Sequence, residues 1–262
     1  MKRILLLLLY FFSCIVADGQ STVKLLFSIE KDADFVSADI LGNIYIVKGS
    51  ELIKYNEKGS ICCTFSNRNY GAITSIDARD PLRVLLFYKP FGIVLLLDNN
   101  LAEQSKIELR NLDIHDPLLV CSSEIQGIWV YDNATTRLYK FNDQLQAVSL
   151  SNDLRQDVMN NINPVLMIES DYWLVIQDVS RLLVFDKMGN YFKSIALLKA
   201  EKGQLIHDEW FYASNGKLMR LNLRNGNLSE VALPFPTLNS GLVLTSQQLL
   251  RLIEKRIEIY SF

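Results

Sequence analysis

Two neighbouring stretches of the chain, Gly42–Val47 (GNIYIV) and Leu52–Gly59 (LIKYNEKG), decide the fold. Each is rich in β-branched and aromatic residues, and the second ends in a turn that contains Asn and Gly. Runs of this composition, joined by a short gap, are typical of two antiparallel strands in a hairpin. This pair of predicted strands serves as the reference for recognising repeats in the rest of the chain.

Degenerate copies of the pair recur roughly every 40 residues up to the C-terminus, and such a period is typical of repeat folds. The copies are marked by the first apolar residue of their second strand: Leu52, Ile93, Leu138, Leu182, Leu218 and Ile257. An apolar run precedes each pair and another follows the turn, so each unit has room for four short strands. The repeat therefore predicts an all-β fold, a six-bladed β-propeller of four-stranded antiparallel blades.

The two ends of the repeat predict how the ring closes. The last copy ends at Phe262, directly after its third strand, whereas an unassigned strand, Val23–Ser28, precedes the first copy. We expect the N-terminal strand to complete the last blade, because closure removes exposed strand edges that promote aggregation. The alternative is an N-terminal strand that packs only locally.

Residues 1–19 predict a cleaved secretory signal. Basic residues precede the apolar run Ile4–Phe12, and a cleavage site follows near Gly19. This run is too short for a transmembrane span. We expect residues 20–262 to form a single propeller domain that is secreted or periplasmic. A lipoprotein anchored through Cys14 is the minor alternative.

Charge and cysteine content limit the function classes. The chain has 27 Lys and Arg against 29 Asp and Glu, and no basic block, which argues against nucleic-acid binding. Three cysteines follow the signal, and we interpret Cys62, Cys63 and Cys121 as small buried hydrophobic residues. Their spacing does not match that of metal ligands.

No constellation of catalytic residues is recognisable in the sequence. The two histidines, His115 and His207, stand alone, which argues against a hydrolase triad or a histidine-based zinc centre. The acidic and amide residues at Asp98–Asn100 and Asn142–Asp143 recur at the same hairpin of each unit, so we interpret them as turn residues. We therefore predict no catalytic residue, no metal and no cofactor.

The three tryptophans and one insertion are interpreted as structural features. All three tryptophans, Trp129, Trp173 and Trp210, align with Tyr45 in the repeat, and we interpret them as packing between blades. Residues 151–163 lengthen one connection between repeats.

In that insertion, Ser151 or Asn152 could cap a short helix with Leu154, Val158 and Ile162 on one face. We interpret the insertion as a cover for the end of a blade. A lid or docking helix is the alternative.

A ligand is expected on one face of the ring, where the connections between blades and the hairpins between second and third strands meet. Exposed aromatic and arginine side chains are common interface anchors. The candidate binding residues in these loops are Arg68, Tyr70, Phe91, Arg110, His115 and Phe235.

The stretch from Gly42 to Gly59 resembles the repeat of NHL-type six-bladed propellers. In that family a strand of the form G-N-I-Y-V is followed by a basic residue, an aromatic residue and a glycine turn. The resemblance covers nearly all of the chain after the signal, and it implies the fold but no particular activity, since the family includes binding modules and enzymes.

The leading hypothesis is a non-catalytic binding or scaffold propeller that engages a protein partner through one loop face. One alternative is a lactonase-like, metal-dependent hydrolase, whose family resemblance implies a central metal held by Glu, Asn and Asp residues. Asp39, Asp77 and Glu169 lie near inner strands, although no motif selects them. A glycan-binding propeller is the other alternative.

Overall fold

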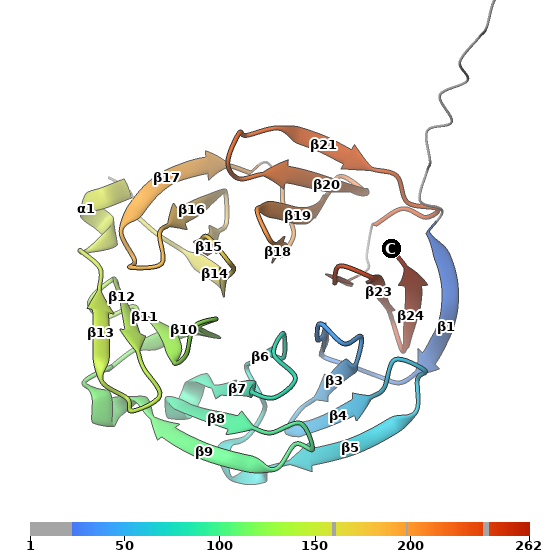
Figure 1. The fold of residues 1–262 in the computed structure, drawn as a ribbon, viewed down its shortest axis with the longest axis horizontal. Coiled ribbons are helices and arrows are strands. Elements are labelled where there is room, and N and C mark those ends of the chain that lie inside the picture. Colours follow the sequence, from blue (N-terminus) through green and yellow to red (C-terminus); the bar gives the residue numbers. More distant parts are fainter. Residues whose placement is uncertain (1–22, 159–160, 198, 238–240) are drawn as a thin grey trace, which may run out of the picture.

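A computed structural model describes residues 23–158, 161–197, 199–237 and 241–262. Within them, the strands form six four-stranded antiparallel sheets arranged as the blades of a ring (Figure 1). The predicted six-bladed propeller is thereby confirmed. The predicted signal sequence, residues 1–19, lies outside the described residues.

The first three blades follow one another along the chain, each from its inner to its outer strand. Blade one comprises β2 (Phe35–Ala38), β3 (Ile44–Lys48), β4 (Glu51–Tyr55) and β5 (Ile61–Ser66). Blade two comprises β6 (Ser75–Asp77), β7 (Val84–Tyr88), β8 (Ile93–Leu97) and β9 (Glu103–Glu108). Blade three comprises β10 (Pro117–Ser122), β11 (Ile128–Asp132), β12 (Arg137–Phe141) and β13 (Ala147–Leu150).

The second half of the ring has the same order. Blade four comprises β14 (Pro164–Glu169), β15 (Leu174–Asp178), β16 (Arg181–Phe185) and β17 (Tyr191–Ala196). Blade five comprises β18 (Gln204–Ile206), β19 (Glu209–Ser214), β20 (Lys217–Asn222) and β21 (Leu228–Val231). Blade six comprises β22 (Gly241–Leu244), β23 (Gln248–Ile253), β24 (Arg256–Ser261) and the N-terminal strand β1 (Lys24–Glu30).

Strand β1 is the outer strand of blade six, and its pairing with β24 closes the ring. It runs antiparallel to β24, from Lys24 opposite Ser261 to Glu30 opposite Arg256. The expectation that the N-terminal strand completes the last blade is confirmed, and the two ends of the ring lie side by side in Figure 1.

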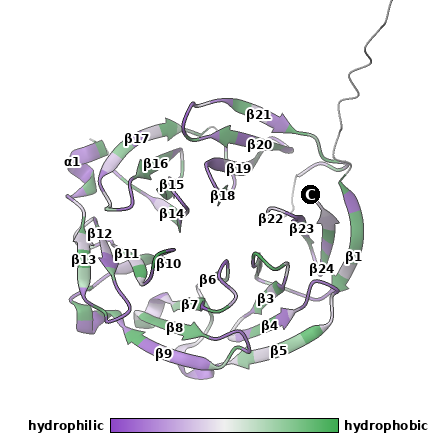
Figure 2. Cartoon of the chain, viewed as in Figure 1, coloured by the Kyte–Doolittle hydropathy of each residue, from purple (hydrophilic) through white to green (hydrophobic). Residues whose placement is uncertain are grey.

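The core lies between neighbouring blades. The second and third strands are the most buried: every residue of β7 and β8 is buried, whereas the outer strand β9 is almost entirely exposed. Figure 2 shows the same contrast, with β8 hydrophobic and β9 largely hydrophilic. Apolar side chains from facing blades fill each boundary, and this burial is the main contribution to stability.

The tryptophans pack between blades, but they do not share one position. Trp129 matches Tyr45, because each joins the core cluster towards the following blade. Trp173 precedes β15, and Trp210 joins the cluster towards the preceding blade, so the prediction of a single position is wrong. Counted from the hairpin between second and third strands, Trp210 occupies the position of Ile44, which also joins the cluster towards the preceding blade.

The cysteines also depart from expectation in part. Cys121 is buried, and burial raises the pKa of its thiol. Cys63 is half-buried against the core of blades one and two. Cys62 is exposed, so its predicted burial is wrong: it lies on the outer strand β5, where alternate side chains face solvent.

The Asn and Asp residues between third and outer strands shape turns, as predicted. The Asp98 carboxylate accepts the backbone N–H groups of Asn100 and Ala102, and Asn142 accepts that of Gln146. The same arrangement occurs at Asn56, Asp186 and Asn222. Side-chain oxygens that bond the backbone two to four residues later stabilise such turns without a metal.

The insertion folds as the short helix that its pattern predicts. Helix α1 (Leu154–Val158) buries both of its end residues in the core of blades three and four, with Ile162 packed alongside. Asp153, rather than Ser151 or Asn152, bonds the helix N-terminus by accepting the Arg155 backbone N–H at 3.0 Å. The insertion covers the side of a blade, which favours that interpretation over a lid.

Candidate functional site

Because the strands of each blade alternate in direction, the loops gather on two faces. We call the upper face the one with the connections between blades and the hairpins between second and third strands. The lower face holds the loops between inner and second strands and the turns between third and outer strands. The predicted candidate residues all belong to connections of the upper face.

The upper face brings some of these residues together. The short helices η1 (Arg68–Tyr70) and η2 (Lys89–Phe91) meet, with the rings of Tyr70 and Phe91 6.1 Å apart. Tyr70 also packs on Tyr88 at 5.4 Å, so its ring is partly core, whereas Phe91 is 55% exposed.

The next connection, η3 (Leu109–Leu112), carries Arg110 and leads to His115. It is tied to η2 by the Leu109 backbone N–H, which donates to the Gly92 carbonyl at 2.9 Å. Arg68, Arg110 and His115 are exposed. These residues therefore lie on connections that border blades two and three, and their part in binding stays a prediction.

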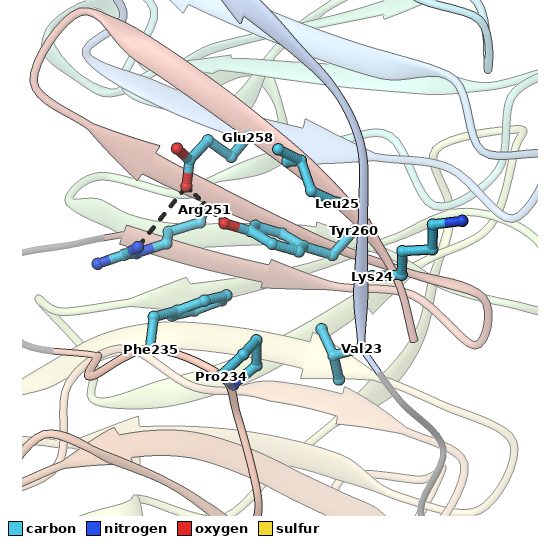
Figure 3. A pocket seen from close by; sticks show the side chains of 8 residues that line it. All are labelled: Val23, Lys24, Leu25, Pro234, Phe235, Arg251, Glu258 and Tyr260. Atoms are coloured by element: carbon cyan, nitrogen blue, oxygen red, sulfur yellow. Dashed lines mark hydrogen bonds and ion pairs between the residues drawn. The ribbon is translucent and has the colours of Figure 1, made fainter.

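Phe235 lies elsewhere, in a groove of about 540 Å³ between blades five and six (Figure 3). The Arg251 guanidinium lies over its ring at 4.2 Å, and the Tyr260 ring is 4.8 Å away. Glu258 pairs with Arg251 at 3.6 Å and accepts the Tyr260 hydroxyl at 2.7 Å. The six candidate residues thus do not converge on one site.

The lower face carries an apolar set that sequence reasoning missed. Large apolar side chains stand exposed on the loops between inner and second strands of four consecutive blades. These apolar tips, with their exposed fractions, are Ile40 (67%), Leu41 (62%), Leu82 (67%), Ile125 (71%) and Tyr172 (52%). The only sequence signal was an apolar residue inside a predicted turn, as at Leu82 beside Pro81.

A polar network beneath the tips fixes the loops that carry them. The Arg79 guanidinium donates to both oxygens of Asp77, at 2.8 and 2.6 Å, and to the Glu169 carbonyl in blade four. The backbone N–H of Ile40, in blade one, donates to the Arg79 carbonyl at 3.4 Å. Arg79 thus links the loops of blades one, two and four.

The carboxylate of Glu169 joins blade three to the same network. Its side chain is fully buried and accepts the Glu124 backbone N–H at 2.6 Å, the Trp129 indole N–H at 3.1 Å and the Lys140 ammonium at 3.2 Å. Burial disfavours the charged form, but these donors outweigh it and hold the pKa of Glu169 below its usual value.

The same balance holds for Asp77. Burial opposes its charge, yet Arg79 and the Ser122 backbone N–H outweigh burial and hold the pKa of Asp77 below its usual value. Both carboxylates are therefore ionised at neutral pH and act as fixed braces between blades.

These contacts do not fit the hypothesis of a central metal. Asp39 accepts two backbone N–H groups and the Tyr45 hydroxyl, while Asp77 and Glu169 are bonded as described above. Among the described residues, no group of three or more His, Cys, Asp and Glu side chains could hold a metal ion. The donor set does not match the one that a lactonase-like site implies.

Searches against known proteins show similarity of fold. No protein-family model and no curated protein matches the chain. A catalytically inactive variant of virginiamycin B lyase from Staphylococcus aureus, solved with quinupristin, is 12% identical, with a TM-score of 0.62 over 92% of this chain and 98% of that one. The WD40 domain of Neurospora crassa Pan2 is 9% identical, with a TM-score of 0.63 over 92% and 96%.

A chain of the mitotic checkpoint complex is 8% identical, with a TM-score of 0.62 over 100% of this chain and 99% of that one. Identities this low show the propeller fold alone. In the part of the chain that the structure describes, no helix is long and apolar enough to cross a membrane.

Proposed function

We propose that this propeller is a non-catalytic binding module that engages a protein partner through its lower face. One observation carries the proposal: apolar tips stand exposed on the loops of four consecutive blades, on a frame of cross-blade hydrogen bonds. Large apolar side chains exposed on one face of a protein commonly mark sites of protein association.

A partner that covers the apolar tips would be bound more tightly, because burial of apolar surface lowers the free energy of the complex. Burying a Leu or Ile side chain contributes about 1.5–3 kcal/mol. The bonded frame reduces the entropy that ordering the loops would cost on binding. The chain of similar fold in the mitotic checkpoint complex belongs to a protein assembly, which supports a binding role for such propellers.

We also propose that the chain is exported and cleaved near Gly19, so that the partner is a secreted or periplasmic protein. The support is the arrangement of basic and apolar residues in residues 1–19. Mass spectrometry of the N-terminus of the native protein tests it, and an intact Met1 would contradict it.

The test of the binding role compares variants of the two faces. The lower-face variant replaces Leu82 and Ile125 with Ser. The upper-face control replaces Phe91 and Val179, which are 55% and 64% exposed, with Ser. Each protein is used to capture partners from its native source after mild crosslinking, and thermal unfolding confirms that both variants fold.

We expect the wild type and the upper-face control to recover the same partner, and the lower-face variant to recover about tenfold less, because two buried tips are worth at least 1.4 kcal/mol. Equal recovery by the lower-face variant would refute the use of this face. A specific turnover by the purified protein would refute a non-catalytic role.

A further inference from the structure

The two faces differ in charge. The connections of the lower face carry nine carboxylates against five lysine and arginine side chains. The carboxylates are Asp39, Glu57, Asp80, Asp98, Glu124, Asp143, Asp171, Asp186 and Asp208, and the cations are Lys58, Arg79, Arg83, Lys187 and Arg224. The connections of the upper face carry eight of each sign.

Three of the five cations of the lower face are turned inward. Arg79, Arg83 and Lys187 are 33%, 18% and 24% exposed, and each pairs with a carboxylate of a loop or inner strand. Arg83 also donates to the Gly127 carbonyl at 2.9 Å. The charge of these three side chains is used within the frame, whereas Lys58 and Arg224 stay exposed.

Some carboxylates point outward instead. Asp80 is exposed and accepts the Leu82 backbone N–H of its own turn at 2.9 Å. Asp171 is 51% exposed and pairs with His207, which is itself 73% exposed, while the Arg224 guanidinium lies over the neighbouring Tyr172 ring at 4.2 Å. Each of these carboxylates lies within two residues of an apolar tip, since Asp80 precedes Leu82 and Asp171 precedes Tyr172.

The lower face also has a depression. It has a volume of about 400 Å³, lies between blades five and six and is lined by His207, Asp208, Phe211, Thr245 and Phe262, among others. The face thus combines exposed aliphatic and aromatic side chains, a negative rim and a recess that could seat the end of an elongated ligand.

We propose that the lower face takes a cationic amphipathic segment of the partner protein, with its apolar side chains on the tips and its lysines or arginines beside Asp80 and Asp171. This inference rests on the proposed function and adds the chemistry of the partner. An acidic face would repel a second copy of itself and an anionic membrane, which leaves a basic protein segment as the complementary occupant.

The experiment uses two synthetic helical peptides with the same leucine face, one with lysine and one with glutamate on the polar face. Their binding to the purified protein is measured by fluorescence anisotropy. We expect the lysine peptide to bind at least about tenfold more tightly, and its affinity to fall as salt rises from about 0.05 to 0.5 M.

Charge reversal on each face provides the matched comparison. Asp80→Lys with Asp171→Lys should weaken binding of the lysine peptide about tenfold, while the upper-face control, Asp32→Lys with Glu254→Lys, should leave it unchanged. Equal affinity for both peptides, or no binding of the lysine peptide, would overturn the inference.

The variant that removes the apolar tips distinguishes the binding role of the lower face from the cationic nature of its partner. If Leu82→Ser with Ile125→Ser abolishes capture of the native partner but charge reversal has no effect, the binding role stands and the cationic partner is refuted. If neither change affects capture, the lower face is not the binding surface and both proposals fail.

Discussion

Replacing Arg79 with Met should destabilise the ring by breaking the network under the lower face. The change keeps much of the aliphatic volume but removes three hydrogen bonds, two to Asp77 and one to the Glu169 carbonyl. Asp77, whose side chain is 10% exposed, would keep its charge with the Ser122 N–H at 3.0 Å as its main remaining donor.

The magnitude follows from burial. Removing one partner of a fully buried ion pair costs about 3–5 kcal/mol, whereas an exposed pair contributes about 0–1 kcal/mol. The Arg79 side chain is 33% exposed, so part of its charge is screened by solvent. We therefore expect a loss of about 2–3 kcal/mol in the free energy of unfolding at pH 7.

The effect should depend on pH. In the wild type the pKa of Asp77 in the folded state is lowered, so its contribution to stability is present at neutral pH and is lost as pH falls through that value. In the variant, burial without Arg79 raises this pKa above that of the unfolded chain. Protonation then relieves the buried charge, so the difference between the two proteins should shrink from pH 7 to about pH 4.

Urea unfolding at both pH values measures the effect, with Arg155→Met as the matched control. Arg155 is 56% exposed and pairs with Asp153, so its loss should destabilise the protein much less than the loss of Arg79. A double-mutant cycle with Asp77→Leu should show coupling of at least about 1 kcal/mol. Additive effects, or a pH-independent loss, would refute the proposed role of this pair.

Three further changes test the scaffold. Deleting residues 23–30 should shift the protein to larger assemblies than the wild type in size-exclusion chromatography, because β24 gains an open edge, and an unchanged elution volume would show that β1 is dispensable. Gly127→Ala should cost about 3 kcal/mol or more in thermal unfolding, since its φ is 92° and a Cβ would lie 1.7 Å from the Phe141 carbonyl oxygen; a cost below about 1 kcal/mol would contradict this. Leu154→Ala should cost about 2–5 kcal/mol by urea unfolding, because the side chain is fully buried, and a near-neutral result would mean that α1 is not part of the core.

The repeat made the fold predictable from sequence. Alternating apolar runs and Asn or Asp turns recur in every blade, so one well-formed copy identifies the weaker ones, and the unpaired strand before the first copy indicates how the ring closes. Register within a blade was less predictable. Trp210 faces the opposite side from Trp129 because it occupies the register position of Ile44 rather than that of Tyr45, and alignment by residue type misses a shift of one residue.

The candidate site was hardly predictable, for a different reason. Arg79 and Glu169 are 90 positions apart in the chain, and neither belongs to a local motif. The apolar tips differ in residue type from blade to blade, so no repeated pattern marks them. Only the ring geometry brings Leu82 and Ile125 to the same face as Ile40.

The closure of the ring sets the order in which the molecule can fold. Lys24 is hydrogen-bonded to Ser261 across 237 positions, so β1 has no partner strand until nearly the whole chain is available. Contacts this distant in sequence form slowly, because the entropy of closing a long loop is lost before the contacts stabilise the chain. Blades one to five can therefore pair their own strands before β1 docks onto β24.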